Sequence, residues 1–275
     1  MWISKGEIRK LSQNIREIID GKDIDIRVSN EGDWNILKND IHILAKLKNE
    51  QVNVLQHDKD VLKETLADIS HQLNTPLTSM LIMIDLLENA PPEKQAEFIQ
   101  NIKTGLGRTE WLVSTLLKMA KLEAGAVEFL RESILSTSLI EQAMTPLRIQ
   151  FELKNQSIEV IGEIELSCDK RWTAEALTNI IKNASEHSPD SGTIRIESGE
   201  NPISKWISVI DCGPGLTTGQ IASVFRRFEG SRTGTGYGIG LPLALAIMRG
   251  QDGDVEVSGD NNGSGAVFTL KFYKG

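Results

Sequence analysis

Two short stretches in the second half of the chain have residue types and spacings that suit ligand chemistry. Asn179 and Asn183, in TNIIKNASEHS, are four residues apart, so a helix would place both on one face. Their amide oxygens could orient or ligate Mg²⁺, although two surface or capping asparagines would give the same pattern. Asp211 opens DCGPG directly after an expected strand, and its carboxylate could accept a hydrogen bond from a ligand amine. The glycines there permit a tight turn, and a plain turn is the alternative interpretation.

Two further stretches combine arginine or glycine with apolar residues. VFRRFEG, residues 224–230, has two arginines between phenylalanines, for which a solvated basic patch is the plain interpretation. GTGYGIGL, residues 234–241, leads into an apolar segment. Glycines that open a helix present backbone N–H groups and the positive end of the helix dipole to phosphate. A flexible linker has the same composition, so each stretch alone is ambiguous.

A histidine and a proline interrupt an expected helix in the first half of the chain. DISHQLNTPLTSMLIMIDLL, residues 68–87, contains His71 and Pro76. Pro76 lacks the N–H that would bond to residue 72 and its ring crowds the carbonyl group there, so we expect a kink. Imidazole is nucleophilic near neutral pH, but a single solvent-facing histidine is the ordinary alternative. The apolar seam of this helix consists of Leu66, Ile69, Leu73, Leu77, Met80, Ile84 and Leu87.

The helices that must position the histidine follow from hydrophobic periodicity. Residues 1–53 indicate two short helices around an irregular connector at 20–30. The second helix runs on through the histidine stretch until NAPPEK, residues 89–94, ends it. Another helix then runs to about Glu123, with Gly125 just past its end. A lone helical hairpin cannot bury both apolar stripes, so we predict that two chains pair into a four-helix bundle.

After this hairpin the pattern changes to mixed α/β. Helices are expected at residues 138–153, 170–187 and 240–250. The expected strands are SIEVIG, IELSC, GTIRIES, KWISVID, GDVEVSG and AVFTLKFY. Strands and helices intermix without a strict βαβ alternation, so we predict an α/β sandwich and not a doubly wound sheet. The fold class is therefore multidomain, α and α+β.

Composition and charge narrow the class of protein. The chain has 275 residues, 40% hydrophobic and 25% charged, which suits a soluble globular protein with two domains, or with one domain and a helical extension. Its formal charge of −8 argues against nucleic acid as the main partner. The two cysteines are far apart without metal-ligand spacing, so we expect reduced thiols and a cytoplasmic location. No apolar run approaches the roughly 20 residues that span a bilayer.

Taken together and in this order, the four stretches of the second half resemble the N, G1, F and G2 boxes of the ATP-binding domain of sensor histidine kinases, over residues 135–275. The resemblance implies a Bergerat-type sandwich with ATP under a mobile lid between Gly215 and Gly236. Asp211 would hold the adenine amino group, and Asn179 and Asn183 would serve Mg²⁺ and the phosphates. The nucleotide-binding residues that it implies are Asn179, Asn183, His187, Asp211, Gly213, Gly215, Phe225, Arg227, Phe228, Gly236, Gly238, Gly240 and Leu241.

Two departures and one distinction accompany this resemblance. Related gyrase-type and chaperone-type ATPases have a glutamate at the position of Asn179, and an amide cannot take a proton from water. We therefore expect ATP to be held for another nucleophile. Glu186 stands where the family often has a lysine, and His187 where an aromatic residue often lies against the base.

SHQLNTPLT, residues 70–78, resembles the phosphoacceptor motif of the same family. His71 would be the nucleophile, and Thr75 matches the residue that positions a water for phosphatase activity. Gln72 stands where the family usually has an acid; it can accept a hydrogen bond from the ring but not its proton, so we expect it to orient the ring. Such a glutamine also occurs in a subgroup of the family. A bend at Pro76 would let the helix flex between catalytic postures.

The resemblance yields a domain plan and a reaction. Residues 1–53 resemble a HAMP linker, with Glu31-Gly32 opening its second helix. Residues 54–126 would form the dimerisation and phosphotransfer hairpin, and 135–275 the ATP-binding domain. The expected protein is a homodimer that phosphorylates its own histidine from ATP and Mg²⁺ and passes the group to an aspartate of a response regulator. In the family such a linker follows a transmembrane sensor, so the chain would be the cytoplasmic part of a membrane receptor; the alternative is a free-standing soluble kinase. The alternatives are a non-catalytic scaffold or phosphatase-only regulator, and a stand-alone ATPase.

Overall fold

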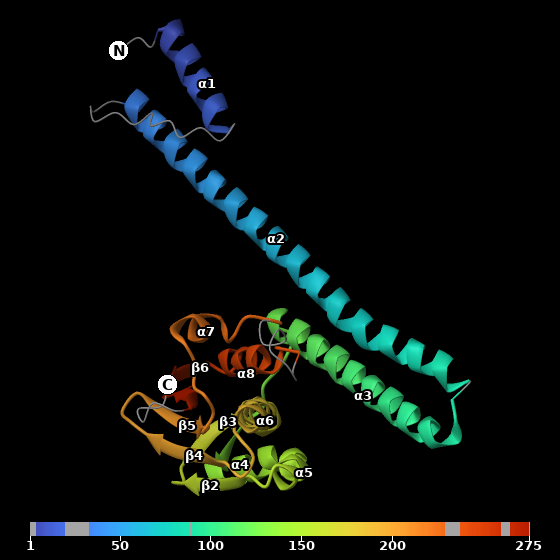
Figure 1. Cartoon of the computed structure of the whole chain (residues 1–275). Helices are drawn as coiled ribbons and strands as arrows, with labels where there is room; N and C mark the ends of the chain where they lie inside the picture. Colours follow the sequence, from blue (N-terminus) through green and yellow to red (C-terminus); the bar gives the residue numbers. More distant parts are fainter. Residues whose placement is uncertain (1–3, 20–32, 89, 229–236, 260–264, 275) are drawn as a thin grey trace. The chain divides into compact units, whose positions relative to one another are not determined.

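The structure is a computed structural model that describes residues 4–19, 33–88, 90–228, 237–259 and 265–274 (Figure 1). The expected connector at 20–30, the Glu31-Gly32 start of the second helix, and Gly236 lie outside the described residues. The chain divides into two units, residues 1–70 and 71–275. Within the described ranges, no helix combines the length and the apolar character that crossing a membrane requires.

The first unit contains the two helices expected near the N-terminus, α1 (Lys5–Ile19) and the first part of α2 (Asp33–Leu87). A capping box starts α1, because the Ser4 hydroxyl accepts from the backbone N–H of Glu7 while the Glu7 carboxylate accepts from the N–H of Ser4. The small apolar cluster between the helices consists of Leu11, Ile15, Ile18, Trp34, Ile41 and Ala45.

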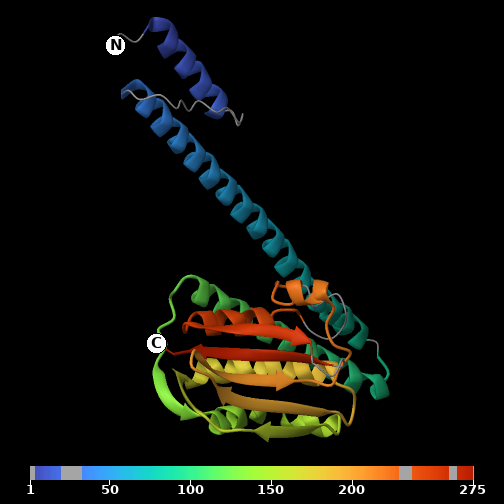
Figure 2. The ribbon, with the colours of Figure 1, turned by 90° about the vertical axis from the view of Figure 1, so that its left-hand side faces the viewer.

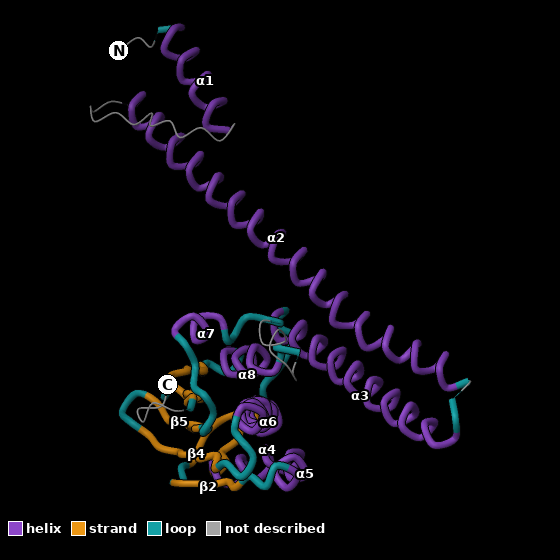
Figure 3. The backbone as a smooth tube through the Cα atoms, in the orientation of Figure 1, coloured by secondary structure: helices purple, strands orange, loops and turns teal. Residues whose placement is uncertain are grey.

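The second unit begins with a helical hairpin, formed by the end of α2 and by α3 (Pro92–Glu123) (Figure 1). α2 is drawn as one continuous helix (Figure 3). Pro76 lies inside it. The buried thioether of Met80 packs on Gly105 of α3, where a Cβ atom would come within 2.9 Å of the sulfur. Apolar side chains of both helices remain exposed: Leu77, Leu81, Ile84, Leu106, Val113 and Leu117. One hairpin thus leaves much of its apolar surface uncovered, as the sequence predicted.

A mixed five-stranded sheet follows, with strand order β2-β4-β5-β7-β6. β2 pairs parallel with β4, and the other pairs are antiparallel. The strands are β2 (Ser157–Ile161), β4 (Thr193–Glu200), β5 (Ser204–Ile210), β6 (Gly253–Gly259) and β7 (Ala266–Tyr273). These strands lie where the sequence predicted them.

Helices cover one face of this sheet (Figure 2). They include α4 (Ser136–Met144), α6 (Lys170–His187) and α8 (Gly240–Arg249). The side chains of the sheet that form the core below them are fully buried: Ile194, Ile196, Ile207, Val209, Phe268 and Leu270. Each of these alternates along its strand with an outward residue, which is the pattern of a sheet buried on one side. The predicted α/β sandwich is confirmed.

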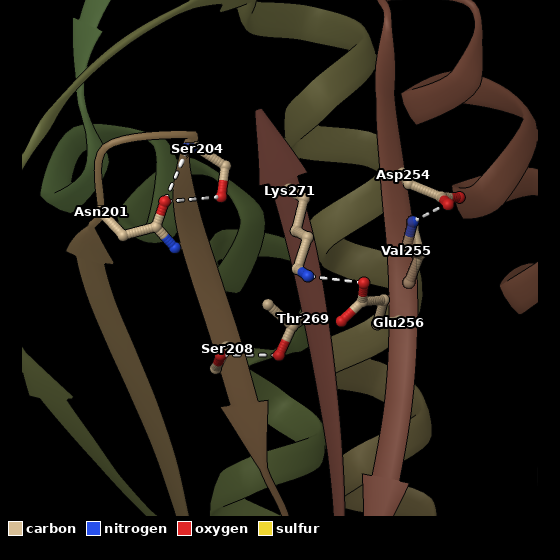
Figure 4. A network of polar contacts seen from close by, with 8 residues as sticks. All are labelled: Asn201, Ser204, Ser208, Asp254, Val255, Glu256, Thr269 and Lys271. Carbon is tan, nitrogen blue, oxygen red and sulfur yellow. Dashed lines mark hydrogen bonds and ion pairs between the residues drawn. The ribbon is translucent and has the colours of Figure 1, made fainter. Parts of the chain in front are cut away.

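The opposite face of the sheet is polar and pairs its own groups across the strands (Figure 4). The hydroxyls of Ser208 and Thr269 are 2.8 Å apart, and Lys271 donates to the Glu256 carboxylate at 2.5 Å. The hydrogen bond to Glu256 raises the pKa of Lys271. The chemistry of the domain must therefore be sought on the helical side and at the ends of the strands.

Three elements differ from the sequence prediction. β1 (Arg131–Leu135) was not predicted; it pairs antiparallel with β3 (Glu165–Asp169), and of its residues only Ile134 is buried, so it shows no clear alternation. α7 (Thr218–Ser223) was also missed, although Thr217 and Gln220 form a capping box at its start. The prediction of one continuous helix over 138–153 was wrong. Pro146 lacks the backbone N–H that an unbroken helix needs there. This segment is α4, the 3₁₀ turn η1 (Thr145–Leu147) and α5 (Arg148–Leu153).

Candidate active site

α6 holds the two asparagines at the edge of the helical layer. Asp169 caps the helix by accepting from the backbone N–H of Trp172 at 3.0 Å. The inner face of α6 is fully buried, and this fixes the rotation of the helix about its axis. Asn179 and Asn183 therefore lie at the side of this buried face, and each is half-buried. The face that packs in the core consists of Ala176, Leu177, Ile180, Ile181 and Ala184.

The Asn179 amide lies against the first residue of α8. Its Nδ2 atom donates to the carbonyl oxygen of Glu175 at 2.9 Å, and its Oδ1 atom would be 2.9 Å from a Cβ atom on Gly240. A carbonyl can only accept, so this contact assigns the nitrogen side of the amide and turns the oxygen toward the glycine-rich segment. The structure thus brings together Asn179 and Gly240, two predicted site residues that lie 61 positions apart in the sequence.

This orientation suits a magnesium ion held jointly with phosphate. Mg²⁺ takes oxygen ligands and commonly binds through one or two protein oxygens plus substrate phosphates. Among the described residues there is no cluster of three or more His, Cys, Asp or Glu side chains that could hold a metal. The Asn179 amide oxygen is a ligand of the kind that such an ion takes, and Asn183 lies one turn further along α6.

Asp211 is nearly fully buried directly after β5, with 5% of its surface exposed. Its Oδ1 atom accepts from the backbone N–H groups of Gly213 at 2.9 Å and Ala266 at 3.0 Å. Its own N–H donates to the Ala266 carbonyl at 3.0 Å. A Cβ atom on Gly213 would lie 2.7 Å from the carbonyl oxygen of His187, so glycine is required for this close approach. The carboxylate is held rigidly between β7 and the end of α6.

Sequence reasoning missed Gly265, which lies on the other side of this carboxylate. Its φ is +106°, and a Cβ atom there would lie 2.1 Å from the Asp211 carbonyl oxygen. Gly215, which was predicted, has φ of +76° and faces Gly265. The only signal in the sequence is that Gly265 directly precedes the AVFTLKFY strand. Nothing near it in the sequence indicates contact with residue 211.

A backbone hydrogen bond joins the described parts of the arginine-containing and glycine-rich stretches. The N–H of Phe228 donates to the carbonyl of Gly238 at 2.9 Å. Phe228 is buried and left-handed, with φ of +64°, while Gly238 has φ of +65°. Left-handed backbone is costly for phenylalanine, so the surrounding packing holds it there. Phe225 is half-buried nearby in sequence, and Leu241 is buried at the start of α8.

Residues of these two stretches contact α3. Arg227 forms an ion pair with Glu123, the last residue of α3, and burial lowers the pKa of its guanidinium group. The ring of Tyr237 stacks on Trp111, with centroids 6.0 Å apart and planes inclined by 23°. Lys118 forms an ion pair with Glu175 on α6. The C-terminal half of α3 therefore contacts the same segments that carry the predicted nucleotide-binding residues.

His71 belongs to α2 and not to the elements that carry these residues. Its side chain is exposed, and the Thr75 hydroxyl one turn later donates to its backbone carbonyl at 3.0 Å. Gln72 is half-buried. Over the described ranges, no hydrogen bond or ion pair joins His71 to the residues around Asp211 and Asn179.

His187 and the cysteines complete the predicted residues. The His187 side chain is exposed at the end of α6, and its carbonyl rather than its ring faces the Asp211 turn. Cys168 is buried and Cys212 exposed, and both are free thiols, as predicted. Burial raises the pKa of the Cys168 thiol.

Two family models match the chain. The model of the His Kinase A (phospho-acceptor) domain matches residues 61–125, which include His71. The model of the histidine kinase-, DNA gyrase B- and HSP90-like ATPase matches residues 168–274, which include every predicted nucleotide-binding residue.

Curated relatives agree in sequence. The sensor protein CreC of Escherichia coli (strain K12) is 26% identical over 181 residues, 65% of this chain and 38% of its own length. The sensor histidine kinase WalK of Bacillus subtilis (strain 168) is 30% identical over 177 residues, 60% of this chain and 28% of its own. The chain thus spans less than half the length of these relatives.

Solved structures agree in fold. The histidine kinase AdeS of Acinetobacter baumannii superposes with a TM-score of 0.63 at 21% identity, over 74% of this chain and 97% of that one. The histidine kinase ThkA, solved in complex with the response regulator protein TrrA, gives 0.65 at 20% identity, over 83% and 66%. ShkA, solved in complex with AMPPNP, gives 0.57 at 25% identity, over 76% and 45%.

Proposed function

The chain belongs to the sensor histidine kinases, and we propose that it transfers the γ-phosphoryl group of ATP to its own His71. The observation that carries this proposal is the Asn179 amide, whose oxygen faces Gly240 while its nitrogen donates to Glu175. That geometry suits the binding of Mg²⁺ and phosphate at the start of α8. It offers no base for activating water, because an amide cannot take a proton.

ATP would bind between the Asp211 turn and the start of α8. The Asp211 carboxylate would accept a hydrogen bond from the amino group of adenine, in a buried position where such a bond is strong. The backbone N–H groups that open α8 would face the phosphates, together with the positive end of the helix dipole. Asn179 and Asn183 would hold Mg²⁺, which supplies charge neutralisation on the phosphates. The AMPPNP complex of the related ShkA supports an ATP-like ligand.

The phosphoryl transfer would use the exposed imidazole of His71. A ring nitrogen attacks the γ-phosphorus, a P–N bond forms, the bond to the bridging oxygen breaks, and ADP leaves. Gln72 would orient the ring, while the proton of the imidazole leaves to water. Catalysis then depends on positioning and charge, as in phosphoryl transfer generally. If Gln72→Ala were labelled as fast as the wild type, the orienting role would be wrong.

We further propose the partners and the domain plan. Two chains would pair through the hairpin of residues 54–126, since its apolar side chains are exposed in a single chain. Phospho-His71 would pass its phosphoryl group to an aspartate of a response regulator, a partner that the ThkA–TrrA complex supports. Residues 1–53 would act as a HAMP-like linker and 135–275 as the ATP-binding domain. ATP and response regulators are cytoplasmic, so the reaction requires that this part of the protein face the cytoplasm.

A labelling experiment tests the reaction directly. The purified chain and a His71→Ala variant are incubated with γ-labelled ATP and Mg²⁺, and the product is treated with acid and with base. We expect label that requires His71, is lost in acid and survives base, as a phosphoramidate does. Bound nucleotide without label would favour a non-catalytic scaffold or a phosphatase-only regulator. Steady release of phosphate without a phospho-enzyme would favour an ATPase.

A further inference from the structure

The C-terminal end of α6 is held by a lysine from another helix. The last carbonyl groups of a helix lack partners within it, and a cation there is favoured by the helix dipole. Lys154, at the end of α5, donates from Nζ to the carbonyl oxygens of Ser185 at 2.6 Å, Glu186 at 3.3 Å and Ser188 at 3.3 Å. One ammonium group thus contacts three carbonyls of a single helix end.

A glutamine two residues later completes this arrangement. The Nε2 atom of Gln156 donates to the carbonyl oxygens of Ser185 at 3.1 Å and Pro189 at 3.1 Å. Asn155, between the lysine and the glutamine, is left-handed with φ of +50°, a conformation that asparagine tolerates. The chain turns at this residue, so that both neighbouring side chains reach the same helix end. We call Lys154 and Gln156 the α6 clamp.

The helix end that the α6 clamp holds is also one wall of the Asp211 turn. The backbone N–H of Cys212 donates to the Ser188 hydroxyl at 3.4 Å. A Cβ atom on Gly213 would lie 2.7 Å from the carbonyl oxygen of His187. Residues 212 and 213 therefore rest directly on residues 187 and 188. A shift of this helix end would move the turn that presents the Asp211 carboxylate.

We propose that Lys154 is a positioning residue for the purine base: by holding the end of α6, it sets the position of the Asp211 carboxylate and thereby the preference for adenine. This inference rests on the proposed function, in which Asp211 accepts from the adenine amino group. Lys154 would act through the end of α6, to whose carbonyl groups its ammonium group donates. A lysine that only stabilised the fold would change the fraction of folded protein but would leave the preference between two bases unaltered.

The test compares ATP with ITP, whose base has an oxygen in place of the amino group. Both nucleotides displace the fluorescent analogue TNP-ATP from the full chain and its variants. The measured ratio is the dissociation constant for ITP divided by that for ATP. For Lys154→Met we expect this ratio to fall about fivefold, which is about 1 kcal/mol of discrimination. The loss should come from weaker ATP binding, with ITP binding little changed. Lys154→Arg, which keeps the cation, should recover most of the ratio.

Two further variants serve as controls. Lys274→Met removes a lysine that pairs with Glu200 on the sheet, away from α6, and should leave the ratio as in the wild type. Asp211→Asn should abolish the preference for ATP, because the side chain then offers a donor as well as an acceptor. If Lys154→Met does not fold, Gln156→Met tests the same clamp and should also lower the ratio.

The outcomes separate this inference from the proposed function. If the wild type prefers ATP and Asp211→Asn does not, but Lys154→Met or Gln156→Met retains the wild-type ratio, the positioning role is overturned and the proposed site stands. If the wild type itself binds ATP and ITP equally, the role of Asp211 is wrong and the inference fails with it.

Discussion

Arg227 and Glu123 form an ion pair between the arginine-containing stretch and the last residue of α3. The two residues are 104 positions apart in the numbering, and the same end of α3 also carries the Lys118–Glu175 pair. Arg227 is therefore engaged by a carboxylate in this arrangement of the chain. A triphosphate and Glu123 would compete for the same guanidinium group.

We expect Glu123→Gln to bind ATP about threefold more tightly, because Arg227 would then be available to the phosphates. The effect is small, since partly exposed ion pairs contribute only about 0.2–1 kcal/mol. Nucleotide affinity is measured by displacement of TNP-ATP at low and high salt, and the difference should shrink at high salt. Glu110→Gln, an exposed residue of the same helix, is the control for the change in charge. Equal tightening in both variants would contradict the competition.

Gly240→Ala should slow autophosphorylation about tenfold or more, because misplacing a group by about 1 Å can cost about 100-fold in rate. Its new Cβ atom would be 2.9 Å from the Asn179 amide oxygen and would displace it. The initial rate of His71 labelling is measured at several Mg²⁺ concentrations. Gly219→Ala is a matched control, since a Cβ atom there meets nothing within 4 Å. A Gly240→Ala variant with the wild-type rate would exclude Asn179 from metal and phosphate binding.

Leu106→Asp should dissociate the proposed dimer. Leu106 is 62% exposed on the apolar stripe of α3, and a carboxylate there would be buried without a partner when two hairpins pair. We expect the dissociation constant of the dimer to rise at least about 100-fold, which corresponds to about 2.7 kcal/mol. Molar mass is measured by light scattering over a dilution series. Leu130→Asp, 79% exposed but outside the hairpin, should remain dimeric. A dimer that survives Leu106→Asp would place the interface elsewhere.

Thr75→Ala should separate autophosphorylation from the expected phosphatase activity toward the response regulator. The Thr75 hydroxyl lies one turn from His71 and donates to its carbonyl, so its loss leaves the imidazole in place. Autophosphorylation should stay near the wild-type rate, while dephosphorylation of a phosphorylated response regulator is lost. Both rates are followed on the same preparation with labelled phosphate. An unchanged phosphatase rate would remove Thr75 from that role.

The local features of the chain were readable from its sequence. The prolines near residue 91 and Gly125 bound α3, which the structure places at Pro92–Glu123, close to the prediction. The strands of the main sheet show period-two alternation, because one face is buried and the other polar. The candidate site residues could be proposed from the sequence because each motif has a local pattern: a helix face, a tight turn or a glycine-opened helix.

Contacts between distant segments were decided only in the tertiary structure. Gly265 is required by the Asp211 carbonyl, which reaches it because β5 pairs with β7. Lys154 is an ordinary lysine in sequence until α5 brings it to the carbonyl groups that end α6. Sequence periodicity reports which face of an element is buried. Which atoms meet depends on strand order and on helix packing, and these are set by the whole chain at once.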